Sequence, residues 1–343
     1  MGREETVIDA GGREVRVSSP SKVYFPPHDG APAVTKLDVV RYYQAVAEVA
    51  LRGLRERPTT LKRWVDGIAG ESFFQKRLPA TAPDWLQKAV VTFPSGRTAT
   101  ELVCTEPAHL AWANNLGVID FNPWPVRRAD LDHPDELRVD LDPSPGAMWD
   151  DVRRVALVVR DVLGECGLQS FPKTSGSRGI HVYARIVPEY GFDDVRRAAV
   201  ALAREVERRE PGVATARWWK EERRGVFIDY NQNARDRTVA SVASVRPVPG
   251  AWVSMPLSWD HVPACELGEF TIRTAPGLLA EGDPHASIDD AAYGIGPLLD
   301  MARRDAEAGI PDAPWPPHFR KQAGEPTRVQ PSRARRRPPR GAS

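Results

Sequence analysis

The order of secondary-structure elements predicted between residues 137 and 230 constrains the fold more than any other feature of the sequence. Apolar runs and alternation predict strands at 137–142, 168–173, 179–186 and 226–230. Apolar stripes of helical period predict helices at 149–166 and 194–208. The predicted order is therefore β-α-β-β-α-β.

This order is that of the ferredoxin-like topology, in which the first strand lies between the third and the fourth. We expect an α+β fold with a ferredoxin- or RRM-like catalytic core at about 131–300 and an N-terminal α/β module at about 1–130. In that module the sequence predicts hairpins at 6–17 and 89–104, a helix at 36–55 and a short helix that ends near Gly117. Thr35 and Asp38 have the spacing of a capping box for the longer helix.

Composition limits the classes of partner and the compartment. Because 47 Lys and Arg oppose 46 Asp and Glu, any grip on nucleic acid must come from a local patch. The three cysteines are widely spaced, which favours buried thiols over disulfides or a zinc site. No apolar run is long enough to span a membrane and no signal core is present, so we expect a cytoplasmic protein. We also expect a monomer.

The C-terminal segment differs from the rest of the chain. From residue 311 it is rich in Pro and Arg, a composition typical of a disordered basic tail. We therefore expect one folded domain over 1–310 and a basic tail over 311–343 of the kind that adds salt-dependent, non-specific affinity for polyanions.

Two acids lie on one face of the first core strand. The strand period of two sends Val139 and Leu141 to one side and Asp140 and Asp142 to the other. Two such carboxylates repel each other unless a positive group lies between them, and a hard divalent cation such as Mg²⁺ or Mn²⁺ meets that need. Acids also commonly end strands at turns, so the pair alone leaves both interpretations open.

A third acid, Asp229, lies in the middle of the last core strand, which is otherwise apolar. An unpaired carboxylate inside such a strand is costly, and the topology places this strand beside the one with Asp140 and Asp142. Three carboxylates can hold two cations for in-line phosphoryl displacement. The alternative is an ion pair between Asp229 and one of the many arginines.

The turn at residues 174–181 has the composition of an anion site. Glycines let backbone N–H groups converge, hydroxyls add donors, and Arg178 offers a planar fork for phosphate. A Walker loop is excluded because its spacing is absent and a strand follows the turn. The other interpretation is a plain hairpin connection.

The three segments together resemble a known family. Residues 139–143 (Val-Asp-Leu-Asp-Pro), 174–181 (Thr-Ser-Gly-Ser-Arg-Gly-Ile-His) and 226–233 (Val-Phe-Ile-Asp-Tyr-Asn-Gln-Asn) resemble the three motifs of the archaeo-eukaryotic primase superfamily. The similarity is greatest to bacterial polymerase domains, namely that of ligase D and the stand-alone primase-polymerase C, and it covers about residues 5 to 300.

The resemblance implies roles for particular residues. It implies that the catalytic acids Asp140, Asp142 and Asp229 bind two metal ions, Mn²⁺ or Mg²⁺. The nucleotide-binding residues that it implies are Lys62, Ser175, Arg178, His181, Gln232 and Arg246. It further implies that Lys22 and Lys36 bind a DNA 5'-phosphate and that Arg63, Phe73 and Phe74 contact the template. From residue type alone, the two Phe would be core residues and the two Lys solvated surface.

The chain departs from the family pattern at two positions. Arg178 stands where ligase D polymerases carry Lys, which keeps the charge but changes the geometry offered to phosphate. Relatives often have a His near residues 118–124, and this chain has none there.

The resemblance implies template-directed addition of nucleotides, with ribonucleotides preferred, to a primer 3'-hydroxyl at short 5'-phosphorylated gaps or breaks. Implied partners are gapped or broken DNA, nucleoside triphosphates, an ATP-dependent DNA ligase and Ku.

Three alternative functions remain to be weighed against this one. A covalent ligase-type enzyme would need Lys-x-Asp-Gly, and Lys62 with Asp66 and Gly67 has the wrong spacing. A non-catalytic module that binds 5'-phosphate ends and a metal-dependent nuclease both remain.

Overall fold

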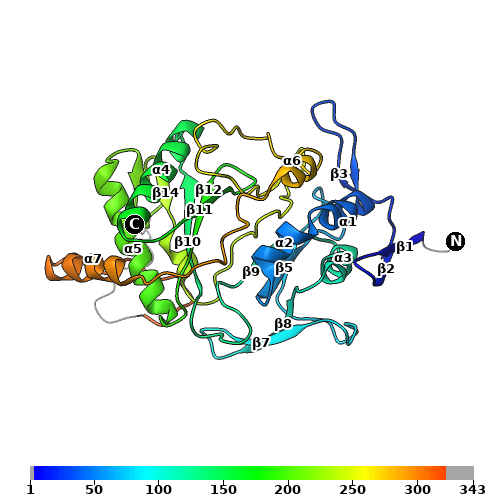
Figure 1. The fold of residues 1–343 in the computed structure, drawn as a ribbon, viewed down its shortest axis with the longest axis horizontal. Helices are drawn as coiled ribbons and strands as arrows, with labels where there is room; N and C mark the ends of the chain where they lie inside the picture. Colours follow the sequence, from blue (N-terminus) through cyan, green and yellow to red (C-terminus); the bar gives the residue numbers. More distant parts are fainter. Residues whose placement is uncertain (1–3, 322–343) are drawn as a thin grey trace, which may run out of the picture.

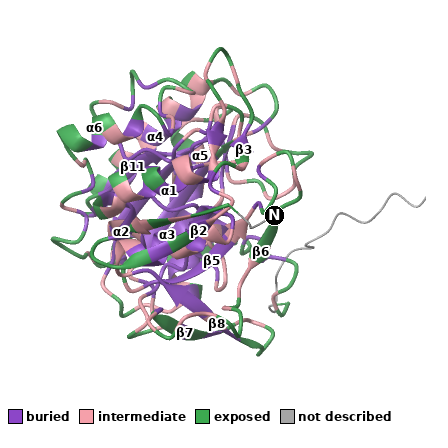
Figure 2. Cartoon of the chain, turned by 90° about the vertical axis from the view of Figure 1, so that its right-hand side faces the viewer, coloured by how far each residue is buried: buried purple, intermediate pink, exposed green. Residues whose placement is uncertain are grey.

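The structure is a computed structural model that describes residues 4–321. Its elements form two halves that lie side by side in Figure 1, the N-terminal one in blue and cyan and the other mostly in green. Figure 2 shows that buried residues occupy the inner strands and the inner faces of the helices, while exposed residues follow the loops. This mixed architecture confirms the predicted α+β class.

The N-terminal half contains small two-stranded sheets, a larger sheet and helices. Its strands are β1 (Glu5–Asp9), β2 (Glu14–Ser18), β3 (Val23–Phe25), β4 (Val34–Thr35), β5 (Pro58–Arg63), β6 (Phe73–Gln75), β7 (Lys88–Thr92), β8 (Thr98–Val103) and β9 (Val118–Pro123), and its helices are α1 (Lys36–Ala45), α2 (Ala47–Leu54) and α3 (Pro107–Asn115). The larger sheet has the order β6-β5-β8-β7, and β9 also pairs with β5. Both predicted hairpins are present, as β1 with β2 and β7 with β8.

The helix predicted at 36–55 is two helices, α1 and α2, and the single-helix prediction is therefore wrong. Its predicted start is right, because the Thr35 side chain accepts a hydrogen bond from the Asp38 amide and Asp38 accepts one from the Thr35 amide. The break lies at Val46, whose backbone has φ −108° and ψ 19° while its side chain is buried. Apolar periodicity misses this break because the apolar stripe continues across it.

The second half is built on one five-stranded sheet of order β11-β12-β10-β14-β13. Its elements are β10 (Glu136–Pro143), α4 (Trp149–Glu165), β11 (Phe171–Thr174), β12 (Ile180–Arg185), α5 (Phe192–Arg209), β13 (Ala214–Thr215), β14 (Val226–Ile228), the 3-10 helix η1 (Tyr230–Asn233), α6 (Ala275–Glu281) and α7 (Gly296–Glu307). As predicted, β10 lies between β12 and β14 and is antiparallel to both.

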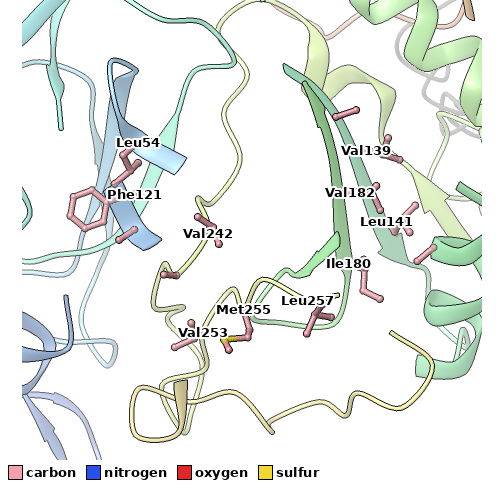
Figure 3. Packing of buried hydrophobic residues seen from close by; sticks show 14 of the residues in the cluster. Leu54, Phe121, Val139, Leu141, Ile180, Val182, Val242, Val253, Met255 and Leu257 are labelled. Atoms are coloured by element: carbon pink, nitrogen blue, oxygen red, sulfur yellow. The ribbon is translucent and has the colours of Figure 1, made fainter. Parts of the chain in front are cut away.

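One face of this sheet is apolar and packs on helices. Val139 and Leu141 of β10 and Ile180 and Val182 of β12 lie together in Figure 3 and share a hydrophobic cluster with buried residues of α4 and α5. Because strand residues alternate in direction, Asp140, Asp142 and His181 lie on the opposite face.

An irregular segment, residues 234–274, covers that opposite face and joins the two halves. Val242, Val253 and Met255 of this segment lie between the two larger sheets in Figure 3. The Ser241 amide donates to the Phe121 carbonyl of β9, and the Thr174 amide of β11 donates to the Met255 carbonyl. The segment thereby brings its own side chains next to the acids of β10.

The predicted strand 226–230 is too long, because β14 ends at Ile228. Asp229 instead caps η1, and its side chain accepts a hydrogen bond from the Asn231 amide. The local hydrogen bond to Asn231 competes with the strand ladder, as short acidic side chains often do. The third acid therefore lies at a strand end and not within an apolar strand.

The packed chain continues beyond Ile310, where the sequence predicted that a tail begins. Ala313 and Trp315 are buried, and Arg196 of α5 donates to the Ala313 carbonyl at 2.7 Å. Residues 322–343 of the predicted tail lie outside the described residues. Within residues 4–321 no helix is both long and apolar enough to cross a membrane. Cys104, Cys166 and Cys265 are free and buried, as expected.

Candidate active site

A row of polar residues crosses the face of the catalytic sheet that lies opposite helices α4 and α5. In the strand register, Lys173 of β11 pairs with His181 of β12, and His181 pairs with Asp140 of β10. Just beyond β14, the Asp229 amide donates to the Asp140 carbonyl at 2.8 Å. Residues directly opposite on neighbouring strands have their Cβ atoms about 5 Å apart, so the topology alone brings these four residues together.

The three predicted acids converge. One carboxylate oxygen from each of Asp140, Asp142 and Asp229 lies within 4.8 Å of the others. Asp140 is only 9% exposed, whereas Asp142 is open to solvent. Gln232 Nε2 donates to Asp229 Oδ2 at 2.9 Å, which orients the third carboxylate. Among residues 4–321 neither Asp142 nor Asp229 forms an ion pair, so the proposed Asp229–arginine pair is not present.

The pKa values of all three acids are raised. Burial raises the pKa of Asp140 to about 6, although the charge of Lys173 opposes this. The charge of Asp140, followed by burial, raises the pKa of Asp142 to about 7. Burial and then the charges of the other two acids raise the pKa of Asp229 to about 7. Within the described residues no Lys or Arg forms an ion pair with these acids, and a divalent cation with oxygen ligands fits the site both by donor type and by charge.

The turn between β11 and β12 faces these acids. Ser175 Oγ accepts hydrogen bonds from the amides of Ser177 and Gly179, at 3.2 and 3.0 Å, and so keeps its own hydroxyl hydrogen to donate. Gly176 has φ +67°, and a Cβ there would collide with Arg246. A Cβ on Gly179 would collide with the Leu141 carbonyl of β10. Gly179 therefore lets the turn lie against the strand that carries the acids, and Gly176 lets it lie against the segment that carries Arg246.

Two of the acids and the turn line one cavity of about 250 Å³, and the third acid, Asp229, contacts it only through Gln232. The predicted residues that line it are Asp140, Asp142, Ser175, Arg178, His181, Gln232 and Arg246. Arg178 is exposed at its edge, and Arg246 is held by an ion pair from Nη1 to Asp120 Oδ2 at 3.0 Å. Positive charge thus lies across the cavity from the carboxylates, as a triphosphate would require.

Lys62 is not among the residues that line this cavity. Its Nζ lies 4.9 Å from the ring centroid of Trp64 and 5.1 Å from that of Phe74. Lys62 pairs with Asp120 in the register of β5 and β9, so it belongs to the neighbouring sheet. Its predicted contact with the nucleotide stays a prediction.

The two lysines predicted to bind a 5'-phosphate lie side by side. The Lys36 amide donates to the Lys22 carbonyl at 2.8 Å. Lys22 pairs with Asp66 on the surface, whereas Lys36 is only 5% exposed and its Nζ donates to the Ser18 carbonyl and to Asn115 Oδ1. The interpretation of Lys36 as a solvated surface residue is therefore wrong.

Phe73 and Phe74 are 47% and 56% exposed, so the interpretation of this pair as core is wrong. Arg63 lies over the Phe73 ring, with its Cζ 5.1 Å from the centroid. The pair opens onto a cavity of about 610 Å³ that Lys76 and Phe93 also line. Two exposed aromatic rings among basic side chains form a surface on which bases can stack.

Three residues of the site were not singled out in the sequence. Asp120 is buried and anchors Arg246, and Asn122 lines the cavity in the segment where relatives often have a His. Lys173 is fully buried behind His181. The signal for Lys173 is present in the predicted hairpin, because a turn centred on residue 177 pairs residue 173 with residue 181.

The fold and the site define a class of protein. A ferredoxin-like sheet that carries a carboxylate triad beside an anion-type turn is suited to metal-dependent chemistry on phosphate esters. Residues 35–285 match the family described as "LigD, primase-polymerase domain". The chain therefore belongs to the LigD primase-polymerase domain family, and the predicted resemblance is confirmed.

Known proteins agree with this assignment. The chain is 33% identical over 324 residues to the multifunctional non-homologous end joining protein LigD of Mycobacterium bovis, a match that covers 90% of this chain and 41% of the relative. With the LigD of Mycolicibacterium smegmatis the identity is 32% over 279 residues, which covers 80% of this chain and 36% of the relative. The chain thus spans well under half the length of these relatives.

A solved structure is also similar. The polymerase domain of Mycobacterium tuberculosis ligase D, solved in complex with DNA, has a TM-score of 0.75 and 31% sequence identity to this chain. The match covers 81% of this chain and 99% of that one. The shared fold therefore extends over the whole of the solved polymerase domain.

Proposed function

We propose that this chain is a DNA-dependent primase-polymerase that adds nucleotides to a primer 3'-hydroxyl and fills short 5'-phosphorylated gaps or breaks before ligation. One observation carries the proposal: three carboxylates lie within 4.8 Å of one another, and two of them, Asp140 and Asp142, line a cavity together with the Ser175–Arg178 turn. The similarity to end-joining LigD proteins and to a ligase D polymerase domain solved with DNA supports it.

Asp140, Asp142 and Asp229 would hold two divalent cations, Mn²⁺ or Mg²⁺. When bound, such ions lower the pKa of the primer hydroxyl and neutralise charge on the triphosphate and on the departing pyrophosphate. Asp229 is fixed by Gln232 and by the Asn231 amide, so its position does not depend on the cation. Asp142, the most open of the three, faces the entrance to the cavity.

The turn and its surroundings would bind the triphosphate. The Ser175 hydroxyl and the Arg178 guanidinium offer donors at one end of the cavity, and Arg246 offers a second guanidinium that Asp120 holds in place. A guanidinium fork binds two phosphate oxygens at once, so Arg178 serves in place of the Lys of the ligase D polymerases. Ribonucleotide preference is carried over from the family.

DNA would lie across the N-terminal half. The template bases would stack on Phe73 and Phe74 beside Arg63. A 5'-phosphate would replace Asp66 as the partner of Lys22, next to the more deeply placed Lys36. We infer further that an ATP-dependent ligase seals the filled gap, that Ku delivers the ends, and that the chain acts as a monomer in the bacterial cytoplasm.

Extension of a gapped duplex tests the proposal. A short gap with a 5'-phosphate, Mn²⁺ and labelled ribo- or deoxynucleotides would be given to the wild type and to a variant with Asp140→Ala and Asp142→Ala. We expect template-directed extension by the wild type and a loss of about a thousandfold or more in the variant. A wild type that binds the gap without extending the primer would be an end-binding module, and one that shortens the primer would be a nuclease.

A further inference from the structure

Lys173 is a buried cation without a direct carboxylate partner. Its side chain is fully buried (0% exposed), and within residues 4–321 it forms no ion pair. A buried ammonium group is costly unless each of its N–H bonds has an acceptor. Three acceptors surround Nζ: Ser254 Oγ at 2.6 Å, His181 Nδ1 at 2.7 Å and the Ala240 carbonyl at 2.8 Å.

The directions of these hydrogen bonds follow from counting donors. The Ala240 carbonyl can only accept. Ser254 Oγ donates its single hydrogen to the Thr174 carbonyl at 2.7 Å, so it accepts from Lys173. Burial lowers the pKa of the Lys173 ammonium group well below its usual value. In its protonated form the group has three N–H bonds and no lone pair, and the third N–H then points at His181 Nδ1. An imidazole nitrogen that accepts this bond carries no hydrogen.

The surroundings of Nε2, the other ring nitrogen of His181, also favour a hydrogen on Nε2 and none on Nδ1. His181 Nε2 lies 3.3 Å from Asp140 Oδ1. If Nδ1 carried the hydrogen, the bare lone pair of Nε2 would face a carboxylate oxygen, which is repulsive. With the hydrogen on Nε2, the ring donates toward Asp140 and the cavity. The ring also stacks on Tyr183, whose own ring lies 5.2 Å from Lys173 Nζ.

We propose that Lys173 is a positioning residue that locks His181 as the neutral tautomer with its hydrogen on Nε2. His181 then presents its Nε2–H beside Asp140, and it donates this hydrogen to a phosphate oxygen in the cavity. The second of these roles rests on the proposed function, because it requires a triphosphate in the cavity. The tautomer itself does not.

Nitrogen-15 NMR of histidine-labelled protein tests the tautomer directly. Spectra of the wild type and of His181→Gln identify the His181 signals. We expect Nδ1 to show the shift of an unprotonated, hydrogen-bonded nitrogen and Nε2 that of an N–H nitrogen. A hydrogen on Nδ1 in the wild type would overturn the proposal, and this result needs neither a Lys173 variant nor turnover.

A double-mutant cycle tests whether Lys173 acts through His181. Lys173→Met keeps length and removes the donors, and nucleotide affinity is measured with a labelled triphosphate and Mn²⁺. We expect Lys173→Met to weaken binding about tenfold in the wild type and hardly at all in the His181→Gln background. Equal losses in both backgrounds would show a merely structural role and overturn the proposal.

These readouts separate the two claims. If the wild type fails to extend primers yet shows the Nε2–H signal, the proposed function fails and the tautomer assignment stands. If Lys173→Met does not fold, Ser254→Ala serves instead, since it removes one acceptor of the ammonium and leaves Lys173 in place. We then expect the Nε2–H signal of His181 to persist, and its loss would contradict the donor count.

Discussion

Both ends of strand β10 bury charged side chains, but only one end, here called the balanced end, pairs each buried acid with arginines of the chain. At the start of the strand, Arg138 Nε and Arg185 Nη1 each donate to the Glu136 carboxylate at 2.7 Å. Burial alone would raise the pKa of Glu136, but the charges of Arg57, Arg138 and Arg185 outweigh it and hold the pKa well below its usual value. This end of the strand needs no further ion.

The far end of the same strand has the opposite character. Burial raises the pKa of Asp140 and Asp229, and the charge of Asp140 raises that of Asp142 and adds to the rise at Asp229. None of the three acids has an arginine or lysine in ion-pair distance among the described residues. The difference separates two kinds of charge cluster: the charges of the first are paired within the chain, and we propose that those of the second are paired with a bound cation.

The largest expected effect is on the balanced end. Glu136→Gln leaves three buried arginine side chains without their shared carboxylate. We expect the free energy of unfolding to fall by about 3–5 kcal/mol, measured by urea denaturation. Glu71→Gln, on an exposed acid, is the control, with an expected change of about 0.5 kcal/mol or less. Similar small changes for both variants would show that Glu136 contributes little to the free energy of unfolding, and would contradict this account.

At the far end of β10, where the acids are unpaired, removing an acid should raise the free energy of unfolding. The pKa of Asp229 is raised to about 7 in the folded protein, so the folded state binds the proton of this carboxyl more tightly than the unfolded state does. The stability that this proton contributes is fully present below the unfolded pKa and is lost as the pH rises through 7. Asp229→Asn should therefore stabilise the metal-free protein by about 1–2 kcal/mol at pH 8, with a smaller gain near pH 5. Thermal unfolding in a chelator checks this, and destabilisation at pH 8 would count against it.

Metal binding should follow the same pKa values. Cations bind carboxylates only after deprotonation, and the acids have pKa values raised to about 6 to 7. We expect Mn²⁺ to raise the melting temperature by several degrees at pH 8 and by little at pH 5.5. A Mn²⁺ effect that is independent of pH would place the ion elsewhere. Asp84→Asn, an exposed acid far in sequence from β10, should behave as the wild type does.

The smallest expected effect lies in the other half of the molecule. Lys22→Ala should reduce the preference for a phosphorylated over an unphosphorylated gap by about five- to tenfold, since one exposed charge-assisted bond contributes about 1 kcal/mol. Extension of an open primer-template should be nearly unchanged. Lys88→Ala, also on the surface, is the control. An equal loss of activity on the phosphorylated and the unphosphorylated gap would show that Lys22 does not bind the 5'-phosphate.

The arrangement of the catalytic sheet could be predicted from sequence because apolar alternation and strand order fix it. Apolar and acidic residues alternate over 139–142, which predicts the face of the sheet on which the acids lie. The order of the elements predicts the strands that flank β10. The position of Asp229 did not follow, since a local hydrogen bond to Asn231 ends the strand early. The burial of Lys36 and Lys173 also escaped prediction. Long cationic side chains are usually exposed, and only tertiary acceptors such as Asn115 and Ser254 reverse that tendency.

Direct titration with Mn²⁺, followed by the electron paramagnetic resonance signal of the free ion, is the sharpest test of the unbalanced acid cluster. It would compare the wild type with Asp142→Asn at pH 8 in the presence of a nucleoside triphosphate. We predict that the substitution weakens Mn²⁺ binding by about tenfold or more, whereas Glu71→Gln leaves it unchanged. Equal Mn²⁺ affinity in the wild type and Asp142→Asn would contradict the assignment of the acid cluster as the metal site.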